Sequence, residues 1–415
     1  MSLIPVLAIT AMTAALLCGI RWPGVLLAGV PFTYQAAGIA KVDWLGEAFV
    51  AIATGFALLR FFGEGGKLRP HAIDFALLAV VLWALFATTY APRPDLAMLH
   101  YLPLPITVAG VYGVARFTRP DDRTMVQFLY GVALLGGTLA LLLALVPSQR
   151  VNRLELETAT AVGLAYPLPY VIIASALLFL LSRRLRTQTM ALLTLSAGTY
   201  AALLSGTRSV FIAAFAALAV VLPIIWTRLP MRTTGKITLA IVAAMIIGPM
   251  FFSEQIQPAI DRLTVNFTGG GVSFTDVSSR ERQHSYSLAW TMFTERPFMG
   301  YGHGSFPQLT PFIYPHNLIL ETLCEMGVVG FLVLATWLGL VAKALLRFYR
   351  QSPLAGVIVM AVAVVGIVQM QLSFTLATGR SLFLVSAVLA HGLNVSRRNQ
   401  KPPRRRRAGH YGHPT

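Results

Sequence analysis

Long apolar runs follow one another along almost the whole chain, and they constrain the fold more than any other feature of the sequence. They occupy residues 3–20, 23–40, 46–62, 72–90, 99–116, 124–146, 158–181, 188–204, 209–226, 236–252, 317–347, 354–372 and 378–394. An α-helix needs roughly 20 predominantly apolar residues to cross the hydrocarbon core of a bilayer. Charged residues make up only 12% of the chain, whereas soluble domains carry about 25%. The sequence therefore predicts an all-α polytopic membrane protein with about 12 transmembrane helices.

Basic residues are concentrated in alternate connections between these runs. The basic groups are Arg60/Lys67/Arg69, Arg116/Arg119/Arg123, Arg183/Arg184/Arg186, Arg228/Arg232/Lys236 and Lys343/Arg347/Arg350. An excess of Lys and Arg marks cytoplasmic connections. The connections expected on the opposite side, which is the periplasm in a Gram-negative cell, are 91–98, 147–157, 205–208 and 253–316. The net charge of +17 is then explained by orientation and by attraction to anionic membrane lipids, so nucleic acid is not an expected partner.

The first 45 residues allow two arrangements. One span would give about twelve helices and a cytoplasmic N-terminus, whereas two thin spans would give about thirteen and place the N-terminus outside. We favour one span. The expected organisation is an N-terminal transmembrane bundle at 1–252, a periplasmic loop at 253–316, C-terminal transmembrane helices at 317–394 and a basic cytoplasmic tail at 395–415.

The loop at 253–316 carries helical patterns of its own. The first pattern is formed by Ile256, Ile260 and Leu263, and the second by Arg282, Tyr286, Ala289, Trp290 and Phe293. The sequence Gly269-Gly270-Gly271 separates them and predicts a mobile link between two short amphipathic helices on the membrane surface. A long structured loop in a compact protein is usually functional.

His316 and Asn317 stand at the outer start of the apolar run 317–347. The positive end of a helix dipole disfavours an imidazolium ion, so His316 is expected to be neutral and able to accept a proton as a general base. Asparagine is a good N-cap, and the pair could equally do no more than cap the helix. Both interpretations are open.

Three arginines on the same expected side are candidates for binding phosphate. Arg208 lies in the sequence Ser205-Gly206-Thr207-Arg208-Ser209, at a helix start where free backbone N–H groups attract anions. Arg280 and Arg282 open the second loop helix, and guanidinium groups match phosphate in a forked geometry. The alternatives are a snorkelling Arg208 and a surface helix in which Glu281 offsets its neighbours.

The segment Pro297-Phe298-Met299-Gly300-Tyr301-Gly302-His303-Gly304 predicts a tight, closely packed turn. No strand precedes it, so it is not a dinucleotide-binding fingerprint. We expect His303 to support the structure or to contact substrate. The sequence contains no Walker motif and no cluster with metal-ligand spacing, so no cofactor, metal or ATP is expected.

Three of these stretches resemble the motifs of bacterial O-antigen ligases. His316-Asn317, followed by Gly327 and Gly330, matches the family pattern H-N-x9-G-x-x-G. Residues 282–302 resemble the pattern R-x3-W…(E/D)-R-P-x-x-G-x-G, with Tyr286 where the family has Trp. That departure keeps Arg280 as a candidate beside Arg282. Residues 205–209 also look like the preceding family motif.

The resemblance implies a membrane glycosyltransferase of the C type, located in the bacterial inner membrane with its active site facing the periplasm. Such ligases transfer polysaccharide from undecaprenyl pyrophosphate to the lipid A–core oligosaccharide, with inversion and without metal. Under this resemblance, Arg208 with Arg280, Arg282 or both holds the pyrophosphate. His316 deprotonates the acceptor hydroxyl group, while Asn317, His303, Tyr286 and Glu321 support the site or contact substrate.

Other functions share some of these features. An O-antigen polymerase or a protein O-oligosaccharyltransferase would use the same donor with a different acceptor. A lipid or sugar transporter would carry ionisable residues in the middle of its spans. The spans are almost free of charged residues, and Glu321 and Glu325 are exceptions close below His316, where they would orient it or pack near the interface.

Overall fold

The computed structural model describes residues 3–42, 44–145, 161–226, 277–373 and 375–399, and these form helices joined by short turns. The N-terminal elements are α1 (Leu3–Arg21), α2 (Pro23–Gly29), η1 (Val30–Phe32), α3 (Thr33–Ala40), α4 (Leu45–Gly63), α5 (Ala72–Thr88), α6 (Pro94–Tyr101), α7 (Pro103–Thr107), η2 (Val108–Tyr112), α8 (Gly113–Arg116) and α9 (Asp122–Leu145). The later elements are α10 (Ala161–Ala165), α11 (Leu168–Leu181), α12 (Leu185–Ser205), α13 (Arg208–Trp226), α15 (Val277–Glu295), α16 (Phe306–Leu309), α17 (Leu318–Gln351), α18 (Pro353–Leu372), η3 (Leu376–Thr378) and α19 (Arg380–Asn399).

The chain is an all-α polytopic membrane protein, as the apolar runs predict. Eight helical segments among the described residues are long and apolar enough to cross a membrane, and Ala72–Thr88 is a shorter apolar helix. The runs at 188–204 and 378–394 also form helices, as α12 and α19. The run at 236–252 lies outside the described residues, as do the first loop pattern at 256–263 and the glycines at 269–271.

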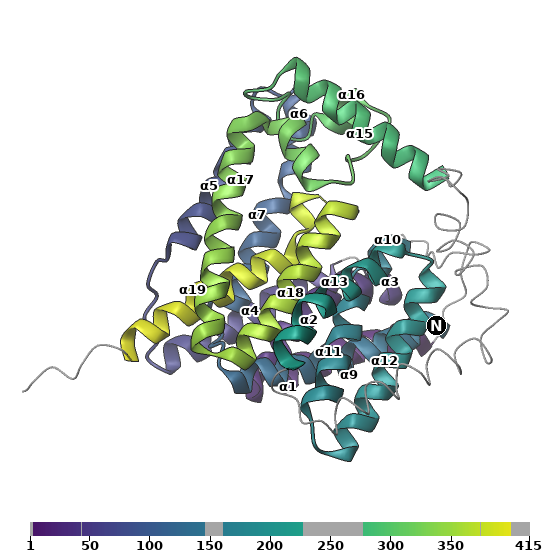
Figure 1. The fold of residues 1–415 in the computed structure, drawn as a ribbon, viewed down its shortest axis with the longest axis vertical. Helices are drawn as coiled ribbons and strands as arrows, with labels where there is room; N and C mark the ends of the chain where they lie inside the picture. The colour runs from purple at the N-terminus through teal and green to yellow at the C-terminus, as the bar shows by residue number, and fades with distance from the viewer. Residues whose placement is uncertain (1–2, 43, 146–160, 227–276, 374, 400–415) are drawn as a thin grey trace, which may run out of the picture.

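The bundle has two distinct ends. At one end, α6, α15 and α16 form a lobe beside the start of α17 (Figure 1), and we call this the His316 end. At the other end, the Asn394 side chain donates to the carbonyl of Arg69 over 2.7 Å, and Ala355 N donates to Asp122 Oδ1 over 3.1 Å. These contacts join the basic connections that precede α5 and α9 to the start of α18 and to the C-terminal part of α19. We call this the basic end.

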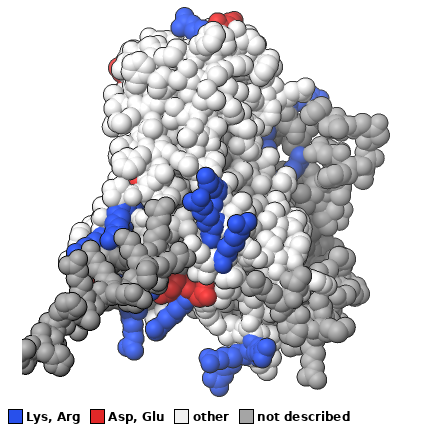
Figure 2. All heavy atoms as spheres, turned by 60° about the vertical axis from the view of Figure 1, so that its left-hand side comes forward, with Lys and Arg blue, Asp and Glu red and all other residues white. Residues whose placement is uncertain are grey.

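Charge separates the two ends on the surface. Figure 2 shows Lys and Arg side chains gathered low on the face drawn, with a broad, almost uncharged belt above them. Exposed apolar side chains such as Phe75, Leu78 and Leu82 on α5 belong to the helical part of the bundle, as expected for contact with lipid. The basic connections at 60–69, 116–119 and 343–347 lie at this one end, as predicted, whereas the connection at 228–236 lies outside the described residues.

Within the described part of the first 45 residues, one helix, Leu3–Arg21, is long and apolar enough to cross a membrane, in line with the single span that we favoured. Gly24 N donates to Gln127 Oε1 near the start of α9, which places α2 at the basic end. Thr33 accepts a hydrogen bond from Arg380, the first residue of α19, at the His316 end. The segment α2–η1–α3 therefore connects the two ends. The short helices α2 and α3 follow one another through η1, and Pro23 and Pro31 lie at the helix starts.

The helix α17 is broken at Gly327, although the sequence predicts a continuous helix there. Gly327 has φ 64° and ψ −170°, which no helical residue adopts. Val328 N donates to Pro297 O at 2.8 Å, and Tyr301 N donates to Cys324 O at 3.0 Å. The backbone groups released by the break are thus paired with the preceding loop, as buried backbone groups must be.

Glycine is required at this junction for steric reasons. A Cβ atom on Gly327 would lie 2.2 Å from the carbonyl oxygen of Phe298, and one on Gly330 would lie 2.8 Å from the indole nitrogen of Trp83. The break changes the direction of α17. Its first helical turns and His316 therefore lie beneath the preceding loop. The two glycines of the H-N-x9-G-x-x-G pattern therefore set the shape of the junction.

The loop helix α15 packs on α17 through small and flexible side chains. Ala289 and Met292 are buried against Phe306 and Cys324. Fully burying a side chain such as Phe306 stabilises a fold by about 1.5–3 kcal/mol. Trp290 is 54% exposed and points away from this cluster, although its spacing suggested the packed face. The predicted second loop helix is confirmed, and its position relative to α17 is fixed.

Candidate functional site

His316 stands just before α17 in a strained backbone conformation. Its φ is 57°, in the left-handed region that side chains other than glycine rarely adopt. Asn317 is the N-cap, because its Oδ1 accepts from Leu320 N at 3.0 Å. The His316 ring instead packs on Tyr314, with ring centroids 4.4 Å apart. The structure therefore assigns the capping role to Asn317 and leaves the imidazole available for other chemistry.

The imidazole of His316 is neutral at pH 7. Burial, followed by the positive charge of Arg282, lowers the pKa of His316 to about 4. Its Nδ1 atom is buried and has no hydrogen-bond partner among the residues that the structure describes. A buried polar atom without a partner is costly and is characteristic of sites that await a ligand or take part in catalysis. The ring can accept a proton.

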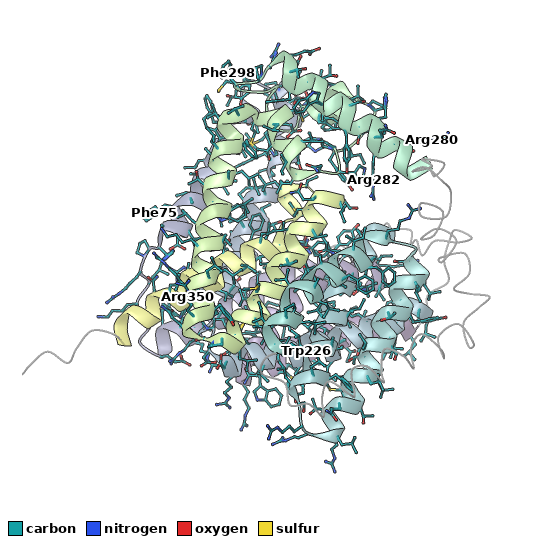
Figure 3. The ribbon with its side chains drawn as sticks, viewed as in Figure 1. Phe75, Trp226, Arg280, Arg282, Phe298 and Arg350 are labelled. Carbon is teal, nitrogen blue, oxygen red and sulfur yellow. The ribbon has the colours of Figure 1, made fainter. Side chains whose placement is uncertain are left out.

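Arg282 and Tyr286 reach this region from one face of α15. They are four residues apart, so their side chains lie one turn from each other. The guanidinium group of Arg282 donates to Ser373 Oγ over 3.2 Å, and the hydroxyl group of Tyr286 donates to the carbonyl of His316 over 3.4 Å. In Figure 3, Arg282 extends from α15 toward the interior of the molecule. Both predicted residues are thus brought to His316.

Arg280 lies on a different face of α15. Residues two positions apart in an α-helix are rotated by about 200° about the helix axis. Arg280 and Arg282 therefore point in nearly opposite directions. Arg280 is exposed, whereas Arg282 is half-buried. Of the two loop arginines, Arg282 is the one that faces His316.

Glu321 lies in the first turns of α17 beneath His316. Its side chain is 6% exposed, and its carboxyl group hydrogen-bonds to the backbone of Leu376. Its Oε2 atom has no hydrogen-bond partner among the described residues. Tyr314 lies near enough to Arg282 and Glu321 to respond to the charge of both. Glu321 therefore links the start of α17 to the α18–α19 connection.

The α18–α19 connection forms part of the site, and the sequence analysis did not single it out. Ser373 accepts from Arg282, Leu376 contacts Glu321, and the half-buried Arg380 donates to Thr33. A signal was present in the sequence. Gly379-Arg380-Ser381 places an arginine at the start of an apolar helix, as Gly206-Thr207-Arg208-Ser209 does.

Arg208 is the first residue of α13, as predicted. Gly206 precedes it with φ 61° and ends α12 in the left-handed conformation, so the chain reverses within a very short turn. Ser205 and Thr207 are buried in this turn. The helix α13 packs against α18, whose far end carries Ser373, the partner of Arg282. The role of Arg208 in binding phosphate stays a prediction.

His303 has a structural position. It is 5% exposed, and its Nδ1 lies 2.9 Å from Glu325 Oε2. The same carboxyl group accepts from Gly304 N at 2.8 Å and from Phe306 N at 3.1 Å. Glu325 therefore holds the glycine-rich turn against α17, which is a role that the sequence analysis did not predict. His303 supports that turn and is closed off from solvent.

The described residues contain no group of three or more His, Cys, Asp and Glu side chains placed to hold a metal ion. The positive charge that acts on the His316 ring is that of Arg282. This arrangement can bind an anion beside a neutral imidazole. It can therefore support a reaction that needs both charge stabilisation and a proton acceptor.

A comparison with protein families gives a match over this part of the chain. Residues 190–335 match the family model described as O-antigen ligase. This stretch, which is less than half of the chain, is similar to the O-antigen ligase family. It runs from α12 into α17 and includes every residue that the sequence analysis named for the site. Arg380 lies outside it. A comparison with curated proteins found no match.

Proposed function

We propose that this protein is an O-antigen ligase, which transfers polysaccharide from undecaprenyl pyrophosphate to the lipid A–core oligosaccharide. The observation that carries the proposal is the neutral His316 imidazole, with its buried Nδ1 atom lacking a partner among the described residues, set beside the half-buried Arg282. The family match to residues 190–335 supports ligase or polymerase chemistry on a lipid-linked polysaccharide.

The donor pyrophosphate binds to arginines at the His316 end. Arg282 supplies a guanidinium group on the α15 face nearest His316, and Arg208 supplies another at the free backbone N–H groups that begin α13. Arg380 is a secondary candidate beneath the site, whereas Arg280 lies at the solvent edge on another face of α15. The lipid tail lies along the apolar helices, so the pyrophosphate is presented at the membrane surface.

His316 accepts one proton in the transfer step. An acceptor hydroxyl oxygen attacks the anomeric carbon, and the bond from that carbon to the pyrophosphate oxygen breaks, with its electron pair leaving on the pyrophosphate. The hydroxyl proton passes to the imidazole and then to solvent. Attack opposite the leaving group inverts the anomeric centre. The arginines stabilise the negative charge that develops on the leaving group, which is the larger electrostatic task.

The low pKa of His316 is compatible with this role. A pKa of about 4 makes the free imidazole a weak base, and the positive charge of Arg282 contributes to that value. A pyrophosphate bound to Arg282 supplies negative charge at the same place, which raises the pKa of His316. The base therefore becomes stronger when the donor is present. The ionisation of His316 and donor binding are coupled.

The His316 end faces the periplasm of the inner membrane in this proposal. The basic end carries Arg60, Arg69 and Arg119 near the ends of apolar helices, which is the pattern of a cytoplasmic face. The lipid-linked donor and the lipid A–core acceptor both then reach the site from the same membrane leaflet. The division into an N-terminal bundle, a periplasmic loop, C-terminal helices and a cytoplasmic tail follows from this orientation.

Transfer with defined substrates tests the proposal. Purified protein is given lipid-linked O-antigen and lipid A–core in the absence of ATP and divalent metal, and wild type is compared with His316→Ala. Transfer to core by the wild type, with loss in a variant that still binds donor, supports the ligase. Growth of chains on lipid-linked repeats without transfer to core would assign a polymerase. Full activity of His316→Ala would remove His316 from the mechanism.

A further inference from the structure

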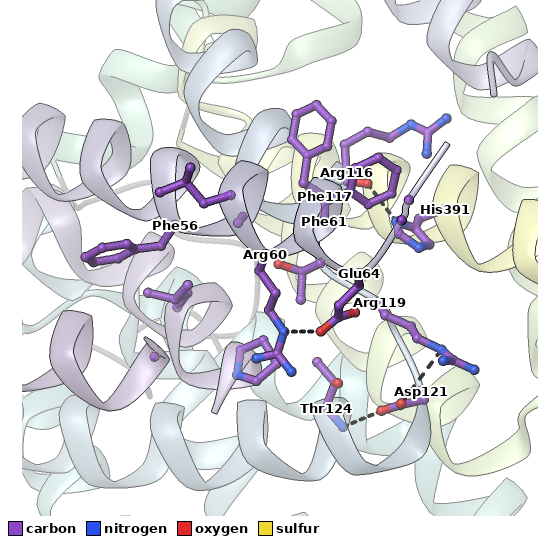
Figure 4. Close-up of a pocket in the computed structure, with 18 of the residues that line it drawn as sticks. Phe56, Arg60, Phe61, Glu64, Arg116, Phe117, Arg119, Asp121, Thr124 and His391 are labelled. Carbon is purple, nitrogen blue, oxygen red and sulfur yellow. Dashed lines mark hydrogen bonds and ion pairs between the residues drawn. The ribbon is translucent and has the colours of Figure 1, made fainter. Parts of the chain in front are cut away.

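A polar cavity lies at the basic end, away from His316. It has a volume of about 870 Å³ and is enclosed by the end of α1, the end of α4 with the turn after it, the α8–α9 connection and the end of α19. Figure 4 shows this cavity from within the bundle. The elements that build it come from both halves of the chain, so the cavity exists only in the folded bundle.

The lining of the cavity is strongly basic. Its cationic residues are Arg21, Arg60, Lys67, Arg69, Arg116 and Arg119, whereas its acidic residues are Glu64 and Asp121. Arg116 is only 7% exposed and is held by Asp74 over 3.0 Å, so it forms part of the framework. The other cations surround it toward solvent. The lining keeps an excess of positive charge after Asp74 is included.

Two of the exposed cations, Arg60 and Arg119, form weak pairs with nearby acidic residues. Arg60 bonds Glu64 one turn away over 2.8 Å, and Arg119 lies 4.0 Å from Asp121 (Figure 4). Side chains in the first pair are 42% and 58% exposed, and exposed pairs of this kind contribute only about 0–1 kcal/mol. A phosphate group can therefore compete for both arginines at little cost.

Apolar and aromatic groups stand next to these cations. Phe61 packs edge-on against Phe117 and against the ring of His391. Leu59 and Phe62 flank Arg60 and Phe61 in the sequence. Their side chains are 74% and 61% exposed on the outer surface of α4. A cationic cavity bordered by lipid-facing apolar side chains fits a molecule with a phosphate head and an apolar tail. It fits a fully soluble anion less well.

We infer that this basic cavity binds the phosphate headgroup of an anionic membrane lipid. Basic pockets between transmembrane helices on the cytoplasmic side are suited to such headgroups. The phosphate lies among Arg60, Lys67 and Arg119, and the acyl chains leave along the exposed apolar face of α4. This inference is independent of the function proposed for His316, because no residue is shared between the two sites.

Binding of short-chain lipids tests the inference. The full-length protein in an uncharged detergent is titrated by calorimetry with dihexanoyl phosphatidylglycerol, dihexanoyl phosphatidylcholine, glycerol 3-phosphate and inorganic phosphate. We expect saturable binding of phosphatidylglycerol. The triple variant Arg60→Gln/Lys67→Gln/Arg119→Gln should bind it on the order of a hundredfold more weakly, since each basic residue near lipid phosphate contributes roughly fivefold.

A matched control separates a site from general surface charge. The triple variant Arg183→Gln/Arg184→Gln/Arg350→Gln removes the same charge from exposed positions outside the cavity lining, and it should bind like wild type. Glu64→Gln should bind more tightly, because it releases Arg60 and removes a negative charge. Both triple variants change exposed side chains, and equal elution from a sizing column confirms that they are folded.

Three results would overturn the inference. They are equal weakening in both triple variants, equal affinity for phosphatidylcholine, and binding of inorganic phosphate as tight as that of the lipid. The first would show only diffuse attraction, the second would show no recognition of charge, and the third would identify a site for a soluble anion.

Discussion

The hydroxyl group of Tyr286 donates a hydrogen bond to the backbone carbonyl of His316 over 3.4 Å. This contact joins the loop helix α15 to the residue immediately before the α17 cap. It holds His316 by its backbone and leaves the ring free, so the loop positions the imidazole without occupying it. The Tyr at this position, where the resembling family has Trp, still supplies one hydrogen-bond donor.

Replacing Tyr286 tests this positioning role. Tyr286→Phe removes the donor and should lower the transfer rate by roughly 2- to 10-fold, the effect of one net hydrogen bond. Tyr286→Trp restores an N–H donor on an aromatic ring and should recover most of the rate. The measurement is kcat for transfer to lipid A–core. Equal rates in the Phe variant and wild type would show that the contact has no positioning role.

His316→Asn should separate activity from stability. Asparagine tolerates the left-handed conformation better than most residues, so the strain at φ 57° is retained or relieved and the melting temperature should not fall. Loss of the imidazole should reduce transfer by about 10²- to 10⁴-fold if it acts as the general base. Thermal unfolding and transfer are measured on the same preparation. A large drop in melting temperature would instead assign His316 a structural role.

Arg282 and Arg280 form a matched pair for donor binding. Arg282→Gln should weaken binding of the lipid pyrophosphate roughly 10- to 100-fold, the range of a charged hydrogen bond. Arg280→Gln should change it by no more than about twofold, because Arg280 is exposed and on nearly the opposite face of α15. Donor affinity is measured by displacement of a fluorescent polyprenyl pyrophosphate. Equal losses in both variants would argue against the assignment of Arg282.

The ionisation of His316 should depend on Arg282. Burial and the charge of Arg282 lower the pKa of His316 to about 4, so its neutral form dominates down to that pH. Diethyl pyrocarbonate, which modifies neutral imidazole, should react at His316 with a midpoint near about pH 4. Arg282→Gln should move the midpoint upward toward the ordinary value of about 6.5, and Arg282→Lys should not. Peptide mass spectrometry measures the reaction.

The same shift has a consequence for stability. The folded pKa of His316 lies below the ordinary value, so the unfolded chain binds more protons between about pH 6.5 and 4. This group therefore favours the folded state above that window, and its contribution is lost as the pH falls through it.

If the midpoint of the reaction with diethyl pyrocarbonate were the same in wild type and Arg282→Gln, the charge coupling between the two residues would be ruled out.

Gly327 and Gly339 test the break in α17. Gly327→Ala places a methyl group 2.2 Å from the Phe298 carbonyl at φ 64°, and it should destabilise the protein by more than about 2 kcal/mol. Gly339→Ala lies in the same helix with no atom within 4 Å, so it should be neutral or slightly stabilising. Thermal unfolding compares them. Similar melting temperatures would mean that α17 can straighten.

Much of the architecture follows from the sequence because membrane-spanning helices satisfy their own backbone groups. Runs such as 124–146 and 354–372 became α9 and α18 almost unchanged. The basic connections predicted for one side also meet at one end of the bundle. The segment α2–η1–α3 was less predictable, since its short helices are linked through Pro31 rather than through one continuous apolar turn.

The sequence nominated candidate residues for the site but not the contacts between them. Local spacing identified His316, Arg282 and Tyr286, because each belongs to a short motif. The sequence could not distinguish Arg280 from Arg282, which depends on how α15 is rotated about its axis. It also missed Glu325 as the anchor of the glycine-rich turn and the α18–α19 connection as one wall of the site. Those contacts join residues distant along the chain.

The sequence by itself determined that this is a helical membrane protein, which runs are apolar enough to span a membrane, and which side chains are candidates to bind anions or accept a proton. These properties depend on hydrophobicity and on the chemistry of single residues. The tertiary structure decided that Asn317 caps α17 while His316 does not, that Gly327 breaks the helix, and that Arg282 rather than Arg280 faces the imidazole. Such outcomes depend on burial, helix rotation and the exchange of backbone hydrogen bonds between distant segments, which no local pattern encodes.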